Sequence, residues 1–115
     1  MTIPLTISDR GRLLPAHLTE HIRERTEKLA HFYGGVRQCR VSVEGPGQHP
    51  LRDRVRVRIY VAVPGTEIAI THQGGEDLPI AIRSAFDAAD RRLEEYARIS
   101  RDFLKALQGR ARRNA

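Results

Sequence analysis

The sequence has 115 residues, of which 40% are hydrophobic and 30% charged, a composition that suits one globular domain and argues against a disordered chain. Cys39 is the only cysteine, which excludes a disulfide framework and a cysteine-rich zinc site, and no apolar run approaches the ~18 residues of a membrane-spanning helix. Twenty basic residues against fourteen acidic ones give a formal net charge of +6, which points to a polyanionic partner such as nucleic acid. The lone cysteine and a start without a secretory signal pattern predict a cytoplasmic protein.

The first part of the chain is expected to form one strand and one helix. Leu5 and Ile7 alternate with polar residues, which is typical of a short half-buried strand, and residues 9–14 are expected to turn. Pro15 is tolerated in the first turn of a helix, and Gly34–Gly35 supply a stop. Between them, apolar residues recur at helical spacing, namely Leu18, Ile22, Leu29 and Phe32.

Three further strands are expected to complete a sheet. Residues 36–44 and 54–63 alternate between apolar and polar side chains, and residues 67–72 repeat the pattern. The segment 45–50 is rich in Gly and Pro and is expected to form a loop, while Pro64–Gly65 is expected to form a tight turn.

A second amphipathic helix is expected to follow, with Asp77 as its N-cap and Pro79 in its first turn. Its apolar stripe consists of Ile82, Phe86, Ala89, Leu93 and Tyr96. Gly109 is expected to end this helix, so residues 1–108 are predicted to form a single domain and residues 109–115 a basic flexible tail. The order β-α-β-β-β-α predicts an α+β fold, in which two helices pack on one face of a four-stranded sheet.

The other face of this sheet is expected to carry a ladder of arginines. Alternate residues of a strand point the same way, about 7 Å apart, which is close to the spacing of successive phosphates along a nucleic-acid strand. The ladder consists of Arg52, Arg54, Arg56 and Arg58. The pattern is equally consistent with a phosphate-binding surface and with a solvated face on which arginines pair with Glu44 or Glu67 across strands.

Both expected helices also carry basic residues, interspersed with acidic ones. The first helix and the residues after it contain Arg23, Lys28 and Arg37, and some of these are expected to form ion pairs with Glu20, Glu24 or Glu27. The second helix contains Arg91, Arg92, Arg98 and Arg101 next to Asp87, Asp90, Glu94 and Glu95. A net basic face on the second helix is therefore expected to be weaker.

Two features suggest chemistry but are interpreted as structural. Residues 17–21 match the H-x-x-E-H pattern of a class of zinc proteases, in which two histidines bind zinc and the glutamate activates water. A domain of this size has little material for a third ligand and a cleft, so a solvated helix surface is expected instead. Cys39 lies at an inward strand position, where cysteine is usually a small core residue. We therefore predict no catalytic residue, no metal, no cofactor and no enzymatic activity.

Several short motifs occur in the order of the expected elements. They are Leu14-Pro15-Ala16-His17-Leu18 and Lys28-Leu29 in the first helix, Val63-Pro64-Gly65 and Ile68-Ala69-Ile70 around the last turn, Glu76-Asp77 before the second helix, and Arg91-Arg92-Leu93 within it. Together, over about residues 4–101, they resemble the family of ribosome hibernation promoting factors and ribosome-associated translation inhibitors. The sequence departs from the family pattern at three places: Pro79 replaces a usual aromatic residue, Arg83 replaces a usual acidic residue, and Glu94–Glu95 stand in a usually basic stretch.

This resemblance implies a fold like that of double-stranded-RNA-binding domains, in a short form without the second domain of long family members. It implies binding to the small ribosomal subunit, free or within the 70S ribosome, over the mRNA and tRNA sites in stressed or stationary-phase bacteria. Ribosomal RNA phosphates would be contacted by Arg23, Lys28, Arg91, Arg92 and Arg98, to which we add the nearby Arg37. We expect a monomer with no membrane or small-molecule partner. The alternative is a stand-alone RNA-binding or protein-interaction module with this fold and another partner.

Overall fold

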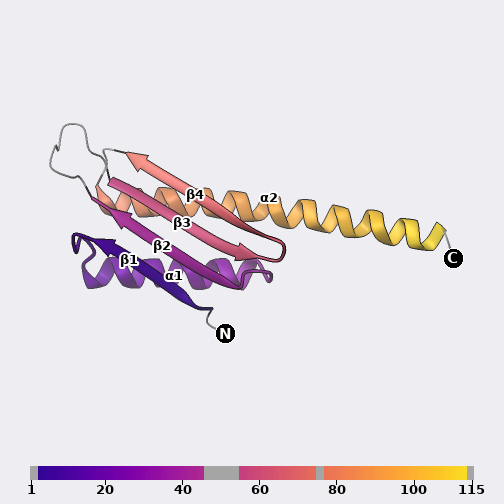
Figure 1. Ribbon diagram of the computed structural model, residues 1–115, viewed down its shortest axis with the longest axis horizontal. Coiled ribbons are helices and arrows are strands. Elements are labelled where there is room, and N and C mark those ends of the chain that lie inside the picture. The colour runs from indigo at the N-terminus through magenta and orange to yellow at the C-terminus, as the bar shows by residue number, and fades with distance from the viewer. Residues whose placement is uncertain (1–2, 46–54, 75–76, 114–115) are drawn as a thin grey trace.

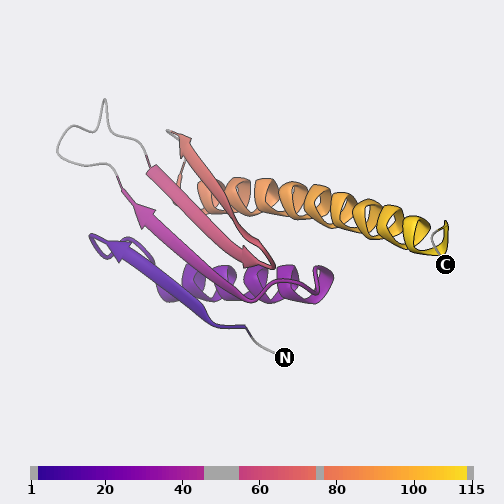
Figure 2. The same ribbon diagram turned by 45° about the vertical axis from the view of Figure 1, so that its right-hand side comes forward.

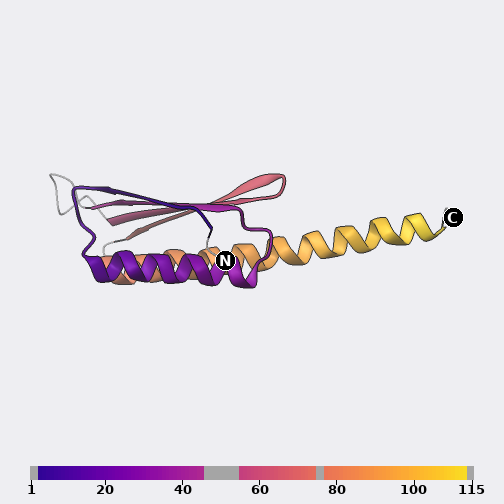
Figure 3. The same cartoon turned by 90° about the horizontal axis from the view of Figure 1, so that it is seen from below.

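A computed structural model describes residues 3–45, 55–74 and 77–113 and shows a four-stranded sheet with both helices on one face (Figures 1 and 3). The elements are β1 (Leu5–Arg10), α1 (Ala16–Phe32), β2 (Gln38–Glu44), β3 (Val55–Val63), β4 (Thr66–Gly74) and α2 (Leu78–Arg113). The strands lie in the order β1-β2-β3-β4, with β1 parallel to β2 and the other pairs antiparallel. The predicted α+β class and element order are confirmed.

The turn between β1 and α1 is held by a carboxylate. β1 runs to Arg10, further than predicted, and the Asp9 side chain folds back over the turn. Its Oδ1 accepts a hydrogen bond from the Leu13 N–H at 2.8 Å, and its Oδ2 accepts one from the Leu14 N–H at 2.9 Å. Pro15 then takes the N-cap position of α1, where its missing N–H costs nothing.

The turn between β3 and β4 has the predicted residues. Gly65 adopts a φ of +85°, a left-handed conformation that is open to glycine at little cost, and the fixed φ of Pro64 suits the position before it. The Tyr96 hydroxyl of α2 donates a hydrogen bond to the Pro64 carbonyl oxygen at 2.9 Å. This bond fastens the turn to α2.

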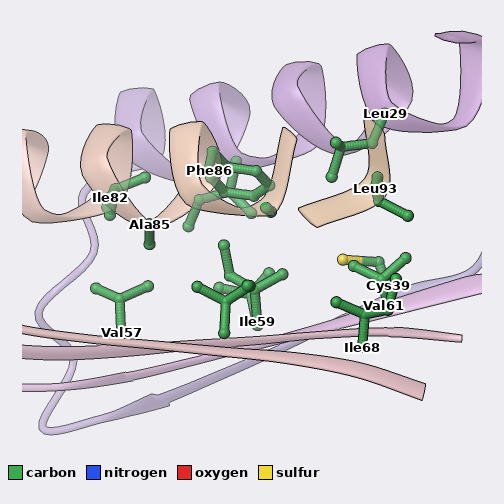
Figure 4. Packing of buried hydrophobic residues seen from close by; sticks show 14 of the residues in the cluster. Leu29, Cys39, Val57, Ile59, Val61, Ile68, Ile82, Ala85, Phe86 and Leu93 are labelled. Atoms are coloured by element: carbon green, nitrogen blue, oxygen red, sulfur yellow. The ribbon is translucent and has the colours of Figure 1, made fainter. Parts of the chain in front are cut away.

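The core lies between the sheet and the two helices. Alternating residues of each strand point toward α1 and α2, where Ile59, Val61 and Cys39 meet Phe86 and neighbouring helix residues (Figure 4). The buried residues of α2 are Ala81, Ile82, Ala85, Phe86, Ala89 and Leu93, which follow helical periodicity. The apolar stripes that predict the two helices therefore meet the sheet, except at Phe32. This last residue of α1 is 67% exposed, so its predicted place in the buried stripe is wrong.

α2 is longer than predicted. It continues through Gly109 to Arg113, so the prediction that Gly109 ends the helix is wrong. An internal glycine costs a helix only about 1 kcal/mol relative to alanine, which does not force an end. As a result, the last turns of α2 extend past the sheet and past the end of α1 (Figures 1 and 3). The proposed division into residues 1–108 and 109–115 stays a prediction.

Cys39 is a core residue, and we expect its thiol to be unreactive in the folded protein. Burial raises its pKa from 9.0 to about 11, although the Thr26 hydroxyl beside Sγ acts in the opposite direction. A thiol-specific reagent at pH 8 should therefore react fully only after a denaturant unfolds the chain. Because the folded pKa is the higher one, this group's contribution to stability is complete below pH 9 and is lost as the pH rises toward about 11. Rapid labelling of the native protein would contradict this burial.

Candidate nucleic-acid interface

Arg25 joins the two helices, which run side by side in the same direction (Figures 1 and 2). Its Nη2 donates hydrogen bonds to Asp87 Oδ1 at 2.9 Å and to Asp90 Oδ2 at 3.1 Å, and its guanidinium carbon lies 5.4 Å from the centre of the Phe86 ring. The Arg25 side chain is only 16% exposed. Arg25 of α1 thus pairs with two of the four carboxylates in residues 78–98 of α2.

Replacing Arg25 should destabilise the fold. In Arg25→Ala, Asp87 and Asp90 lose their shared partner, and we expect the free energy of unfolding to fall by about 1–3 kcal/mol. Arg23→Ala is a matched control, because Arg23 is exposed and, among the residues that the structure describes, pairs only with Glu20 at 3.4 Å on its own helix. That control should cost less than about 0.5 kcal/mol. Urea denaturation of both variants measures the difference, and equal losses would contradict a specific link between the helices.

Because Asp87 and Asp90 pair with Arg25, fewer carboxylates are left to pair with the arginines of α2 than the sequence indicates. Arg91 and Arg98 are exposed and are separated by seven residues, or about two turns, so they lie on one side of α2 some 10 Å apart. With Arg101 they line a shallow hollow that also includes Glu94 and Glu95. Among the described residues, no ion pair within 4.0 Å joins these arginines to a carboxylate.

The other predicted contacts do not lie on this side of α2. Arg92 lines two hollows beside β4, one with Thr66, Glu67 and Ile68 and one with Ala69, Ile70 and Thr71. Arg92 therefore belongs to a different surface from Arg98. Its neighbour in sequence, Arg91, lines the second of these hollows as well as the hollow that contains Arg98.

On α1, helical geometry separates the two predicted basic residues. Lys28 lies three residues after Arg25 and therefore points roughly toward α2, whereas Arg23 lies two residues before Arg25 and points away from α2. Arg37 is exposed on the segment between α1 and β2, where its backbone N–H donates to the Ala62 carbonyl oxygen at 2.8 Å. Helical spacing thus puts Lys28 on the α2 side of α1, and Arg91 with Arg98 on one side of α2. Arg23 and Arg37 lie apart from them, and Arg92 shares a hollow with Arg91 but not with Arg98.

The open face of the sheet carries several arginines, and some of them pair with carboxylates across strands. Arg56 and Arg58 are half-buried on this face, while Arg52 and Arg54 lie outside the described residues. The register places Arg56 beside Glu44, with 3.9 Å between their charged groups, and Arg58 beside Ser42 and Thr71. Of the two interpretations of the ladder, cross-strand pairing describes Arg56, whereas Arg58 has no carboxylate partner among the described residues.

Two more arginines on this face were not among the predicted contacts. Arg40 of β2 contacts Glu67 of β4 at 3.2 Å and stacks on the Tyr60 ring, 4.7 Å from its centre. Arg10 at the end of β1 is in register with Glu44. The outward positions of the strands could have identified Arg40. Arg10 could not be identified in this way, because the predicted first strand ends before it whereas β1 includes it.

The H-x-x-E-H residues lie on α1 beside the first turns of α2. His17, Glu20 and His21 line a hollow that also includes Pro79 and the cation of Arg83. No group of three or more His, Cys, Asp or Glu side chains in the described part of the chain is arranged to hold a metal ion. His17 and Glu20 are exposed, and His21 is half-buried.

Residues 5–101 match the model of the family described as sigma 54 modulation protein / S30EA ribosomal protein. The chain belongs to this family. The match covers all four strands, α1 and the packed part of α2, so the resemblance found in the sequence motifs is confirmed. Comparison with curated proteins gave no significant match.

Solved structures of S30EA-type proteins share the fold. The N-terminal domain of Thermus thermophilus Protein Y has 20% sequence identity and a TM-score of 0.66, with 84% of this chain and 99% of that chain covered. A ribosomal subunit interface protein from Coxiella burnetii has 16% identity and a TM-score of 0.62, with 83% and 98% covered. These similarities confirm the topology at low identity.

Membership of the S30EA family makes this chain a ribosome-associated, non-enzymatic factor of the hibernation type. This agrees with the predicted lack of enzymatic activity. Within the described residues, no helix is both long enough and apolar enough to cross a membrane.

Proposed function

We propose that this protein binds the small ribosomal subunit through phosphates of ribosomal RNA and blocks the mRNA and tRNA sites in stressed or stationary-phase bacteria. The observation that carries the proposal is the arginine pair Arg91 and Arg98, which is exposed and has no ion-pair partner within 4.0 Å in the described part of the chain, while Arg25 holds Asp87 and Asp90. The Coxiella burnetii neighbour is named for the ribosomal subunit interface, and this interface is the region of the ribosome that contains the mRNA and tRNA sites. Such a factor works in the cytoplasm.

The mechanism is occlusion and needs no chemical step. Each guanidinium group can donate two parallel hydrogen bonds to one phosphate, and the helix holds Arg91 and Arg98 at a fixed spacing. Lys28 adds a third cation on the neighbouring helix. A folded basic domain bound in this way takes the volume that mRNA and tRNA would occupy. With only three phenylalanines, three tyrosines and no tryptophan, recognition depends on shape and phosphate positions more than on base stacking.

The remaining predicted contacts extend the proposed interface to other sides of the domain. Arg23, Arg37 and Arg92 point in different directions, so one flat RNA surface would not reach all of them. A ribosomal cleft encloses its ligand and can offer phosphates on several sides. On this basis Lys28, Arg91 and Arg98 form the central contact, and the other three residues are peripheral.

Sedimentation with purified bacterial ribosomes tests the proposal. We expect the protein to co-migrate with 70S particles and isolated small subunits at low salt and to be released at high salt, because each neutralised RNA phosphate contributes about −0.7 to −0.9 to the slope of log K against log salt. Migration at the top of the gradient under both conditions would refute ribosome binding. Equal affinity for free duplex RNA would instead favour a stand-alone RNA-binding module.

A further inference from the structure

The part of α2 that extends beyond the sheet, residues 99–113, carries an exposed apolar stripe. Ile82, Leu93 and Leu104 are eleven residues apart, or about three helical turns, so they lie on one line along α2. Ile82 and Leu93 are fully buried against the sheet, but Leu104 is 56% exposed and the nearby Leu107 is 44% exposed. The core-facing stripe therefore continues where the described domain offers nothing to cover it (Figure 3).

The charge of α2 changes at the same point. Residues 78–98 contain four basic residues (Arg83, Arg91, Arg92, Arg98) and four acidic ones (Asp87, Asp90, Glu94, Glu95), for a net charge of zero. Residues 99–113 contain five basic residues (Arg101, Lys105, Arg110, Arg112, Arg113) and only Asp102 as an acid, for a net charge of +4. The extending segment thus combines exposed leucines with a strong excess of positive charge.

These two properties together select the chemistry of the partner. A second copy of this chain would place a +4 segment against another +4 segment, which like-charge repulsion opposes. RNA would neutralise the positive charge but would leave the leucine stripe in water. A protein groove with an apolar floor and carboxylates along its rim covers the leucines and pairs with the cations at the same time.

We propose that residues 99–113 dock as a helix into an apolar groove, rimmed by Asp and Glu, on a protein component of the ribosome. This rests on the proposed ribosome binding and adds a protein contact to the RNA contacts of the domain. Isolated helices this short are marginal in water, so docking also supplies the tertiary contacts that the domain does not provide.

Two sets of variants test the proposal on purified 70S ribosomes. Leu104→Gln with Leu107→Gln should weaken ribosome binding at least 10-fold, and so should Arg101→Gln with Lys105→Gln. Ile80→Gln is the matched control, because Ile80 is 49% exposed at the start of α2, outside residues 99–113. We expect the control to bind within twofold of wild type. Circular dichroism verifies that each variant is folded.

A photo-crosslinking residue at position 104 identifies what lies against the stripe. A cross-link to one ribosomal protein at an acidic segment, abolished by Arg101→Gln with Lys105→Gln, supports the proposal. A cross-link to RNA, or leucine variants that bind like wild type while the basic variants are weakened, overturns it in favour of RNA. A leucine-dependent dimer in sedimentation equilibrium overturns it in favour of a second copy. Wild type that does not bind ribosomes at all overturns both this proposal and the proposed function, whereas normal binding by the leucine variants leaves the proposed function intact.

Discussion

Replacing Phe86 with alanine should cause the largest loss of stability of any single substitution considered for this protein. Phe86 is fully buried where α2 meets the sheet (Figure 4). Its ring also lies against the Arg25 guanidinium, whose carbon is 5.4 Å from the ring centre. Deleting a buried phenyl group and leaving a cavity costs about 3–5 kcal/mol. Small domains are stabilised by only about 5–15 kcal/mol, so most of the stability should disappear. Urea denaturation followed by circular dichroism measures this loss.

The chain provides a matched control for this experiment. Phe32→Ala removes the same atoms at the end of α1, where the side chain is 67% exposed and touches the His31 ring edge-on. We expect that variant to change the free energy of unfolding by less than about 0.5 kcal/mol, as is usual for surface positions. Similar losses at both positions would mean that the core does not lie where the fold places it.

Reversing the charge of Arg91 and Arg98 should cause the largest loss of ribosome binding. In the double variant Arg91→Glu, Arg98→Glu, two hydrogen-bond donors to phosphate become carboxylates that repel phosphate. With about 1.5–3 kcal/mol for each charged hydrogen bond, we expect the affinity to fall about 100-fold or more. Sedimentation with 70S ribosomes at constant salt measures the loss, and the salt dependence of the remaining binding should be weaker than in wild type.

The control for this variant lies on the opposite side of the molecule. Arg10→Glu with Arg58→Glu introduces the same charge change on the open sheet face, where both arginines lack a carboxylate partner within 4.0 Å among the described residues. If the helical layer is the central contact, this variant should bind ribosomes within about fivefold of wild type, a loss equivalent to roughly 1 kcal/mol. The reverse ranking of the two variants would move the interface to the sheet.

Much of the fold could be predicted because burial leaves a local periodic signal. Leu18 and Ile22 of α1 follow a helical period, Val57 and Ile59 of β3 follow a strand period, and each set is buried as predicted. The inward position of Cys39 follows from the same alternation. The end of α2 could not be predicted in this way, because a glycine signals a helix end only where the chain must also change direction.

The candidate site was only partly predictable. The residue types and their helices were identified, since an excess of arginine is visible in any sequence. Which carboxylates pair with which arginines was not predictable, because Arg25 contacts Asp87 and Asp90 across 62 and 65 residues of chain. Within one helix, Asp87 stands four residues before Arg91, a spacing that favours an ion pair. Only the position of α1 shows that Asp87 and Asp90 are already paired with Arg25.

The sequence by itself determined the order of the elements, the buried face of each and the family, because hydrophobic periodicity and short motifs are local properties. Only the tertiary structure decided which charged residues pair with each other. It also showed that Arg92 and Arg98 lie on different surfaces and that α2 extends beyond the sheet. Ion pairing depends on which elements become neighbours, and the exposure of Leu104 depends on where the sheet ends. Neither ion pairing nor exposure at the end of α2 can therefore be read from the local sequence around the residues concerned.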